Sequence, residues 1–214
     1  MRTGKSNHNQ RAYRFSKRFL DISASLFALI VFMPLFIVIT AFYFFGRNKG
    51  PVFYKQVRIG LNHEPFEIYK FRSMVVGADQ VLREDEALYQ KFVQNGYKLP
   101  TNEDPRITPF GAFIRKTSID ELPQFFNILR GDMSIIGPRP VVERELVEYG
   151  NHVDEFLSVQ PGAMGLWQAT GRSMIQYPQR ADLELEYVRN ASLWFDFKVI
   201  FLTIIAIFDG KGAM

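Results

Sequence analysis

The sequence predicts an α+β protein, a helix-rich single domain with a small β-hairpin, whose N-terminal helix enters a membrane. Three observations predict this fold class. Residues 22–45 carry no charge, residues 52–71 alternate weakly between apolar and polar side chains, and later segments place apolar residues at helical spacing. The change of composition after the uncharged run divides the chain into residues 1–46, the basic N-terminus with the membrane helix, and residues 47–214.

Composition leaves several classes of partner open. The chain has 214 residues, a formal net charge of +4 and a pI of about 9.3. This balance suits nucleic acid, anionic lipid and phosphorylated substrates alike. The absence of cysteine excludes a disulfide framework and a thiolate zinc site.

The N-terminal segment begins basic and turns apolar. Residues 1–18 hold lysine and arginine but no acid. We interpret residues 1–10 as a frayed tail and the cations from Arg11 onward as contacts to anionic lipid headgroups. As a helix, residues 22–45 would extend about 36 Å, against a hydrocarbon core of about 30 Å. A cleaved signal peptide is the alternative, but the run is too long for it and positions 41–43 offer no small-x-small cleavage site.

Pro34 lies near the middle of the uncharged run. Its ring removes one helix hydrogen bond and clashes with the carbonyl of Ile30, so we expect a kink there. Cations precede and follow the run, and the positive-inside tendency then places both ends in the cytoplasm. A re-entrant helix that is broken at Pro34 and returns satisfies both observations, whereas a transmembrane helix satisfies one. Because prolines also occur in true spans, the residues alone leave both alternatives open.

A β-hairpin is expected between Val52 and Phe71, with a loose turn at residues 60–65. Its second arm ends in Lys70 and Arg72, which by themselves indicate a solvated strand edge. The sheet is therefore small, as the fold class requires.

The region 77–103 carries few signals. Residues 79–92 predict a polar helix, and its consecutive acids at positions 84–86 point to different faces, which argues against a metal site. Residues 94–105 are rich in Asn, Gly and Pro and predict a loop. Composition leaves open whether the region 77–103 forms a mobile lid.

Two adjacent carboxylates, Asp120 and Glu121, are the main candidates for chemistry. Basic residues lie before and after them, and apolar residues follow at helical spacing from Leu122, so the acids lie where an amphipathic helix begins. The N-terminus of a helix and nearby cations favour phosphate oxygens. A carboxylate there can attack phosphorus or hold a divalent metal. The alternative is a capping box at Ser118, although Pro123 would then interrupt the helix.

Three further segments follow the acids. Residues 141–149 predict a short amphipathic helix, and residues 181–188 predict a second helix. Residues 195–208 are apolar, but their uncharged part is too short to span a bilayer. This last segment is either a core helix or a helix lying in the membrane interface beside Trp194, and we favour the interface. Its role is otherwise left open.

Several segments together resemble a known family, the bacterial sugar transferases that begin exopolysaccharide and O-antigen synthesis, also called monotopic phosphoglycosyl transferases. The resemblance is long and specific, and it strengthens the re-entrant interpretation of the N-terminal helix. The sequence departs from many members at Met33, before the proline, and at Met164. The similar segments are KFRSM (70–74), DPRIT (104–108), TSIDELPQFFNILRGDMSIIGPRP (117–140) and PGAMGLWQATGR (161–172).

The resemblance implies roles for individual residues. Asp120 corresponds to a nucleophile and Glu121 to a ligand of Mg²⁺. A structural salt bridge is an equal alternative for Arg106, and Trp167 either packs in the core or stacks on uracil. The residues that would bind phosphate are Lys70, Arg72, Arg106, Arg115, Arg139 and Arg172.

The resemblance also implies a function and a location. The expected reaction transfers a hexose-1-phosphate from a UDP-sugar to polyprenyl (undecaprenyl) phosphate, releases UMP and passes through a covalent aspartyl-phosphosugar intermediate. The expected site is a catalytic domain on the cytoplasmic face of the bacterial inner membrane, in contact with membrane lipid. Galactose and glucose are the favoured sugars, and the oligomeric state, a homo-oligomer included, is open.

Two other functions fit part of the sequence. A non-enzymatic membrane-bound adaptor would also need the apolar run and the positive charge, but it has no need of an intact carboxylate pair among arginines. A nucleic-acid binder is not expected, because cations and aromatic residues are not interleaved on one face.

Overall fold

The computed structural model of the chain describes residues 3–94, 99–101, 103–171 and 175–208. By their internal contacts the residues form two units. Unit 1 comprises residues 1–31, 55–68 and 124–213, and unit 2 comprises residues 32–54 and 69–123. The boundary predicted after residue 46 separates the membrane helix from the rest of the chain, and it stays a prediction.

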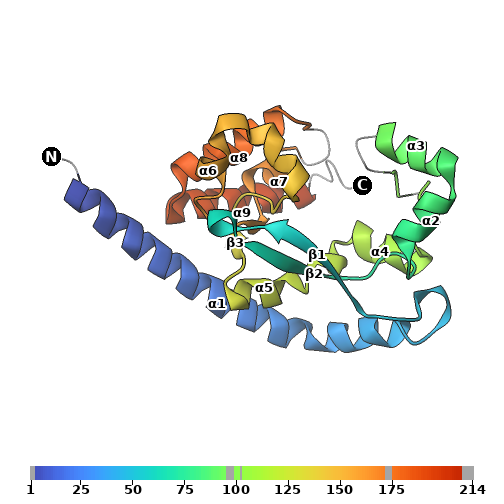
Figure 1. Cartoon of the computed structure of the whole chain (residues 1–214). Helices are drawn as coiled ribbons and strands as arrows, with labels where there is room; N and C mark the ends of the chain where they lie inside the picture. The colour runs from blue at the N-terminus through green and yellow to red at the C-terminus, as the bar shows by residue number, and fades with distance from the viewer. Residues whose placement is uncertain (1–2, 95–98, 102, 172–174, 209–214) are drawn as a thin grey trace. The chain divides into compact units, whose positions relative to one another are not determined.

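The predicted fold class is confirmed. Helices dominate, the predicted hairpin is present as a small antiparallel sheet, and a long apolar helix opens the chain (Figure 1). The helices are α1 (Thr3–Phe42), α2 (Ala78–Glu84), α3 (Glu86–Gln94), α4 (Pro109–Lys116), α5 (Gln124–Arg130), α6 (Val153–Phe156), α7 (Leu166–Thr170), α8 (Gln179–Asn190) and α9 (Leu193–Phe208). The strands are β1 (Phe53–Ile59), β2 (Pro65–Phe71), β3 (Ser134–Ile136) and β4 (Gly162–Met164), and the short 3₁₀ helices are Gly46–Asn48, Leu61–His63, Ile119–Glu121 and Glu143–His152.

Helix α1 includes Pro34 and continues to Phe42. Its residues 10–42 are long and apolar enough to cross a membrane by length and composition, and most of them are exposed. The bend and the re-entry at Pro34 stay predictions. The expected frayed tail is wrong for residues 3–10, which belong to the helix, and residues 1–2 lie outside the described residues.

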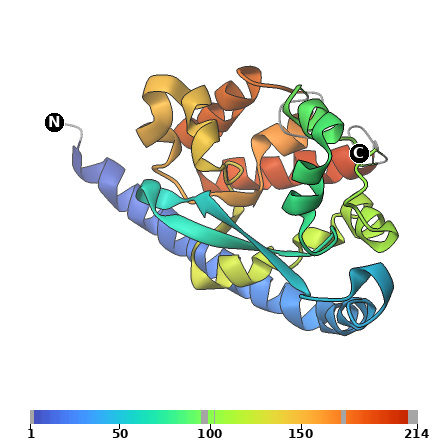
Figure 2. The ribbon, with the colours of Figure 1, turned by 45° about the vertical axis from the view of Figure 1, so that its right-hand side comes forward.

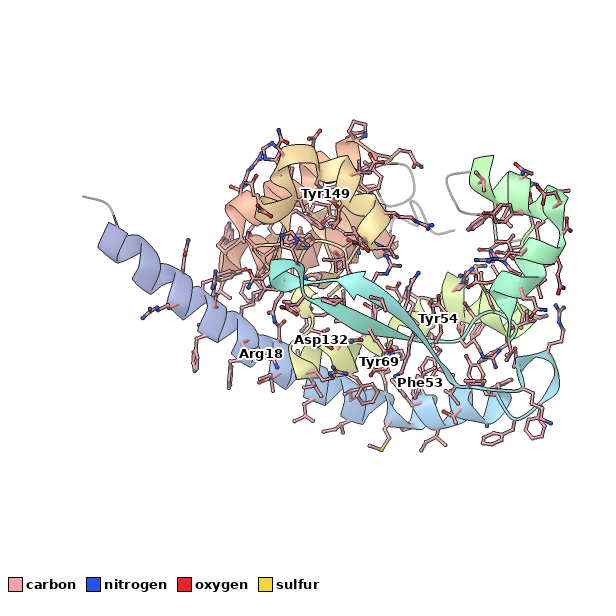
Figure 3. The ribbon with its side chains drawn as sticks, in the orientation of Figure 1. Arg18, Phe53, Tyr54, Tyr69, Asp132 and Tyr149 are labelled. Carbon is pink, nitrogen blue, oxygen red and sulfur yellow. The ribbon has the colours of Figure 1, made fainter. Side chains whose placement is uncertain are left out.

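The basic end of α1 makes specific contacts inside unit 1. The guanidinium of Arg18 donates to the carbonyl oxygens of Ile128 (2.5 Å) and Leu129 (2.7 Å), as Figure 3 shows beside α5. These carbonyls lie in the last turn of α5, where backbone acceptors run out of helical partners, and that of Ile128 also accepts the Gly131 backbone amide at 3.1 Å. Lys17 forms an ion pair of 2.8 Å with Asp196 of α9. For these two cations the expected lipid contact is therefore replaced by contacts within the protein.

Asp21 joins α1 to strand β3. The carboxylate is buried and accepts hydrogen bonds from the Ser134 hydroxyl (3.0 Å) and the Ile135 backbone amide (2.9 Å). A buried carboxylate needs such donors to offset the loss of water. The first half of α1 is therefore an integral part of unit 1.

Strands β3 and β4 form a parallel pair that the sequence analysis did not predict. Ser134 pairs with Gly162 and Ile136 with Met164. A Cβ on Gly162 would lie 2.0 Å from the backbone nitrogen of Gly137, so the two strands can approach only where both residues are glycine. The pairing brings the GPRP and PGAMG segments together. Three-residue strands are too short for an alternating pattern to reveal them.

Two hydrophobic clusters in unit 1 involve the helices from α6 to α9. One cluster contains Ile136, Tyr187 and Val199, and the helices α7 to α9, drawn in orange and red, lie together in Figures 1 and 2. A second cluster contains Tyr149, labelled in Figure 3, which stacks on Phe156 of α6 at 3.9 Å between ring centroids and packs with Leu185 of α8. These packed helices surround the β3–β4 pair with apolar side chains.

Two of the three predicted late helices are confirmed. The helix expected at 181–188 is α8, and the one expected at 195–208 is α9. Residues 141–149 form instead a 3₁₀ helix, Glu143–His152, in which Gly150 has a non-helical conformation. On α9, Val199 is buried while Trp194 is 81% exposed. The core-helix interpretation thus describes the face of α9 with Val199, and the interface interpretation describes the face with Trp194. Contact of α9 with a membrane stays a prediction.

Unit 2 has its own core. Ile39, Tyr43, Phe71 and Ile114 are buried together, and the ring of Phe53 stacks on Phe71 at 5.6 Å. The second half of α1 thus packs with the end of the hairpin and with α4. This packing fixes the end of β2, which carries Lys70 and leads into Arg72.

The predicted helix over residues 79–92 is two helices, because the chain breaks at Asp85. Asp85 has an extended backbone, and its carboxylate accepts the backbone amide of Leu88 at 2.9 Å. This side-chain contact competes with a continuous helix. The loop predicted at 94–105 includes residues 95–98 and 102, which lie outside the described residues, so the lid also stays a prediction.

Replacing Gly162 should strongly destabilise the protein. We expect Gly162→Ala to lower the free energy of unfolding by about 3 kcal/mol or more, because the new Cβ would meet backbone atoms that cannot move aside. Gly77→Ala is the matched control, since Gly77 has φ +73° with open space around it, and we expect it to cost about 1 kcal/mol. Thermal unfolding in detergent measures both, and equal losses would contradict the close approach of β3 and β4.

Candidate functional site

The carboxylate pair lies in unit 2 between two helices. Asp120 and Glu121 belong to the 3₁₀ helix Ile119–Glu121, which follows α4, and helix α5 begins only at Gln124. Ser118 has φ 56°, and its side chain makes no capping hydrogen bond. The capping-box alternative is therefore wrong. A left-handed serine directly before the acids is a strained position of the kind that functional sites retain.

Helix α4 holds Arg115 close to the end of β2. The Thr108 hydroxyl caps the helix by accepting the Gly111 backbone amide at 2.9 Å. A Cβ on Gly111 would lie 1.8 Å from the Ser73 carbonyl oxygen, so the helix packs directly on the chain that leaves β2. This contact brings the last turn of α4, with Arg115, toward the strand that carries Lys70.

Lys70 and Glu121 form an ion pair across this junction. The distance from Nζ of Lys70 to Oε1 of Glu121 is 2.5 Å, and both side chains are half-buried. Charge-assisted hydrogen bonds of this kind are stronger than neutral ones. The pair places a positive charge beside both carboxylates although Lys70 and Glu121 are far apart in the sequence.

Asp120 is a buried carboxylate in a charged environment. Its exposed fraction is 8%, and burial raises its pKa above the usual value. The positive charges of Lys70 and Arg115 lower this pKa, while the negative charge of Glu121 raises it further. Asp120 is therefore an acid whose ionised form depends on its cationic neighbours.

Arg115 is the arginine best placed to accept an anion. It is half-buried, burial lowers its pKa, and the charge of Asp120 acts in the opposite direction. Within the described ranges, its guanidinium makes no hydrogen bond or ion pair that fixes its N–H groups. Its five N–H donors are thus without an acceptor among the described residues, and the charge of Asp120 lies within electrostatic reach.

Arg72 and Arg106 lie in the same unit but already have acceptors. Arg72 donates to the carbonyl oxygens of Pro51 (2.7 Å), Met74 (2.7 Å) and Asn48. Arg106 forms a two-point ion pair with Asp104, with distances of 2.8 and 2.7 Å, and both residues are buried. These contacts favour a supporting role for both arginines, and they match the salt-bridge alternative for Arg106.

Arg139 belongs to unit 1, where it lies on an aromatic ring. Its Cζ is 5.9 Å from the centroid of Trp167, a distance typical of a cation–π contact. The indole of Trp167 is buried and donates to the Ile175 carbonyl oxygen at 3.1 Å, which supports the core-packing interpretation of this residue. Arg172, the remaining predicted phosphate ligand, lies outside the described residues.

The carboxylate pair fits a magnesium ion only in part. Among the described residues, no group of three or more His, Cys, Asp or Glu side chains could hold a metal. Mg²⁺ in phosphate-transferring proteins commonly takes one or two carboxylates and completes its shell with water and substrate phosphate. Asp120 and Glu121 supply such oxygens, although Lys70 holds one of them. The residues thus fit an ion that a phosphorylated ligand helps to bind, rather than a preformed metal cage.

The sequence analysis missed two charged residues of α8. Glu184 is fully buried and accepts the Arg139 backbone amide, and Arg180 lies on the Trp167 ring at 4.3 Å from its centroid. The available signal was the spacing of an arginine and a glutamate one helical turn apart in a segment with buried apolar residues. That spacing usually marks a solvated ion pair, so it gave no reason to place either residue inside.

Comparison with known proteins agrees with the resemblance. A family model described as bacterial sugar transferase matches residues 12–210. An undecaprenyl-phosphate galactose phosphotransferase of Salmonella typhimurium is 42% identical over 211 residues, which cover 97% of this chain and 44% of that protein. The exopolysaccharide production protein ExoY of Rhizobium meliloti is 42% identical over 202 residues, which cover 92% of this chain and 88% of that protein.

A third relative has a different sugar in its name. A UDP-glucose:undecaprenyl-phosphate glucose-1-phosphate transferase of Klebsiella pneumoniae is 37% identical over 205 residues, which cover 92% of this chain and 41% of that protein. The chain thus spans less than half the length of the Salmonella and Klebsiella proteins and most of the length of ExoY.

Removing the charge of Asp120 should stabilise the fold at neutral pH. Because burial raises the pKa, the folded protein prefers the protonated acid, and ionisation costs stability as the pH rises through the raised pKa. We therefore expect Asp120→Asn to raise the free energy of unfolding at pH 7, and the gain to vanish below the ordinary pKa of 3.8. Urea unfolding at several pH values measures the effect. The exposed Asp79→Asn is the control, expected to stay within about 0.5 kcal/mol, and a destabilised Asp120→Asn at pH 7 would contradict the electrostatics.

Proposed function

The chain belongs to the bacterial sugar transferase family, and on this premise we propose that it transfers a hexose-1-phosphate from a UDP-sugar to undecaprenyl phosphate and releases UMP. This would be the first membrane step of exopolysaccharide or O-antigen synthesis. The names of the relatives support both substrates, and they include galactose and glucose, so the proposal leaves the hexose open.

The observation that carries the proposal is the buried carboxylate of Asp120 beside Glu121, Lys70 and Arg115. A carboxylate is a weak nucleophile that departs well from phosphorus, so it suits a reaction in which the enzyme is first loaded and then released. The cations of Lys70 and Arg115 lower the pKa of Asp120 and so favour the ionised form that attacks.

We infer a double displacement at one phosphorus atom. An oxygen of Asp120 attacks the sugar-bearing phosphorus of the UDP-sugar, the bond to the bridging oxygen breaks, and UMP leaves with its electron pair. Sugar-1-phosphate is then bound to Asp120 as an acyl phosphate. A phosphate oxygen of undecaprenyl phosphate attacks the same phosphorus, and the carboxylate of Asp120 leaves unchanged.

The surrounding residues would stabilise the charges of both steps. Arg115, with its unoccupied donors, and Lys70 would hold the phosphoryl oxygens, and Arg139 would bind a substrate phosphate. Arg72 and Arg106 would hold the loops that surround them. Mg²⁺ bound at Glu121 would supply neutralisation of charge on the diphosphate and on departing UMP.

The location follows from the apolar part of α1. We propose that this part enters the inner membrane from the cytoplasmic side, bends at Pro34 and returns, so that the site meets a dissolved donor and a lipid acceptor at one depth. A membrane-bound adaptor that binds anionic lipid is the second candidate. The buried charge of Asp120 costs stability, and an adaptor would not need such a group. The environment of Asp120 therefore favours the enzyme.

Replacing Asp120 should abolish transfer and its covalent intermediate. We expect purified protein with UDP-galactose or UDP-glucose, Mg²⁺ and undecaprenyl phosphate to release UMP, and chelation of the metal to stop the release. Asp120→Asn should lower the rate at least about 10³-fold and leave no sugar-phosphate adduct, because the amide cannot attack phosphorus. Intact-mass spectrometry of each protein, after incubation with the UDP-sugar but without undecaprenyl phosphate, detects the adduct.

The control for this experiment is Asp79→Asn, which should retain the wild-type rate. Mass spectrometry must also show that the amide at position 120 has not hydrolysed. Transfer at the wild-type rate by an intact Asp120→Asn protein would refute the nucleophile.

The re-entrant path can be tested with single thiols, since the chain has no cysteine. We expect Thr3→Cys and His63→Cys to react with an impermeant reagent from the same, cytoplasmic side, because a helix that returns keeps both positions on one face. Labelling in inverted and right-side-out vesicles measures this. Reaction of the two positions from opposite sides would mean that α1 spans the membrane.

A further inference from the structure

A fully buried carboxylate in unit 1 has no part in the proposed reaction. Glu184 of α8 has an exposed fraction of 0%, and its two oxygens lie 3.2 and 3.1 Å from the backbone nitrogen of Arg139. Burial raises its pKa to about 7. A buried carboxylate costs free energy, so a protein that keeps one in its core gains something from its contacts.

The segment that Glu184 contacts is already held on both sides. The Gly137 amide donates to the Met164 carbonyl oxygen at 2.9 Å, and the Gly162 amide donates to the Pro138 carbonyl oxygen at 2.8 Å. Glu184 adds the next backbone contact along this segment, at Arg139. Three successive backbone groups are therefore fixed where the Arg139 side chain begins, and its direction is restricted.

Trp167 supports the other end of the Arg139 side chain. The Cζ of Arg139 lies 5.9 Å from the indole centroid and that of Arg180 lies 4.3 Å from it. Arg180 is 5% exposed, and its Nη1 lies 3.9 Å from Oε1 of Glu145. The rings of Trp167 and Tyr177 thus enclose Arg180, whereas Arg139 is only half-buried.

The charges of this cluster leave Arg139 available for an anion. Arg180 and Arg139 both lower the pKa of Glu184, so one carboxylate faces two guanidinium groups. Arg180 also has Glu145 as a counter-charge. In the part of the chain that the structure describes, the Arg139 guanidinium has no hydrogen-bonded acceptor, and its donors are free for a ligand.

We propose that Glu184 is a positioning residue, which fixes the backbone of Arg139 so that the guanidinium, lying on Trp167, faces a phosphate group of a substrate. The role of Arg139 rests on the proposed function. The phosphate can belong to the nucleotide or to the prenyl carrier, which share this chemistry, and the experiment separates the two.

Trp167 can report on this site directly. The chain has two tryptophans, and Trp194 is exposed on α9, so Trp194→Phe leaves Trp167 as the single tryptophan, which is excited at a wavelength that tyrosine does not absorb. In this background the full chain in detergent is titrated with UMP, with a short-chain prenyl phosphate and with inorganic phosphate. We expect a saturable change of emission with UMP or with the prenyl phosphate, and the ligand that binds more tightly identifies the source of the phosphate.

Glu184→Gln should weaken this binding at least about 10-fold, because the neutral amide holds the Arg139 backbone less firmly. Glu186→Gln is the matched control, since Glu186 is exposed on the same helix two residues later, and it should stay within about 2-fold. An affinity of Glu184→Gln within about 2-fold of the parent would overturn the proposal. So would a parent protein in which none of the three ligands changes the emission of Trp167.

A double-mutant cycle shows whether Glu184 acts through Arg139. Arg139→Gln should weaken binding. The double variant with Glu184→Gln should then bind as tightly as Arg139→Gln alone. Both are titrated up to ligand concentrations that saturate Arg139→Gln. An additional loss in the double variant would mean that Glu184 acts on the fold in general. Thermal unfolding of each variant accompanies the titration, and if Glu184→Gln does not fold, Glu184→Asp replaces it with an expected smaller loss of affinity.

Failure of this proposal and failure of the proposed function give different results. Binding at Trp167 is measured without turnover, so a protein that transfers no sugar phosphate from any UDP-sugar would refute the function while the titration still decides the role of Glu184. A transferase with unaltered binding in Glu184→Gln would refute only the positioning role.

Discussion

The burial of Asp120 next to Glu121 is the constraint around which unit 2 is built. A buried carboxylate beside a second, half-buried one is costly, and Lys70 and Arg115 supply positive charge that offsets part of this cost. Those cations can reach the acids because Gly111 lets α4 pack on the chain after β2. The arrangement resembles the general trade between stability and activity, in which a reactive group is kept in surroundings that disfavour it.

The sequence predicted the elements that have a long pattern. The uncharged run lies in α1, the alternating segment became the hairpin, the segment expected as a helix at 181–188 became α8, and the apolar segment at 195–208 became α9. Elements decided by a single contact could not be predicted: Asp85 divides one helix into two by bonding to Leu88, and the β3–β4 pair depends on two glycines that meet in space. Periodicity carries no information about either event.

The candidate site was predictable in its centre and less so at its edges. The acid pair, Lys70 and Arg115 lie together as the motifs suggested, because charge and family resemblance point to the same residues. Arg72 and Arg106 carry equal charge in the sequence, yet carbonyls and Asp104 occupy their donors. Charge alone cannot distinguish an arginine that binds a ligand from one whose donors are used within the protein.

The contacts at the start of α1 also affect how the protein can be handled. Removing the N-terminal segment to obtain a water-soluble version would take away Arg18, Asp21 and Lys17 together. The carbonyls of Ile128 and Leu129 would lose the guanidinium of Arg18 as a donor, the hydroxyl of Ser134 would lose its acceptor, and Asp196 its counter-ion. The N-terminal segment therefore cannot be removed without loss of contacts in unit 1, because the first half of α1 packs in that unit.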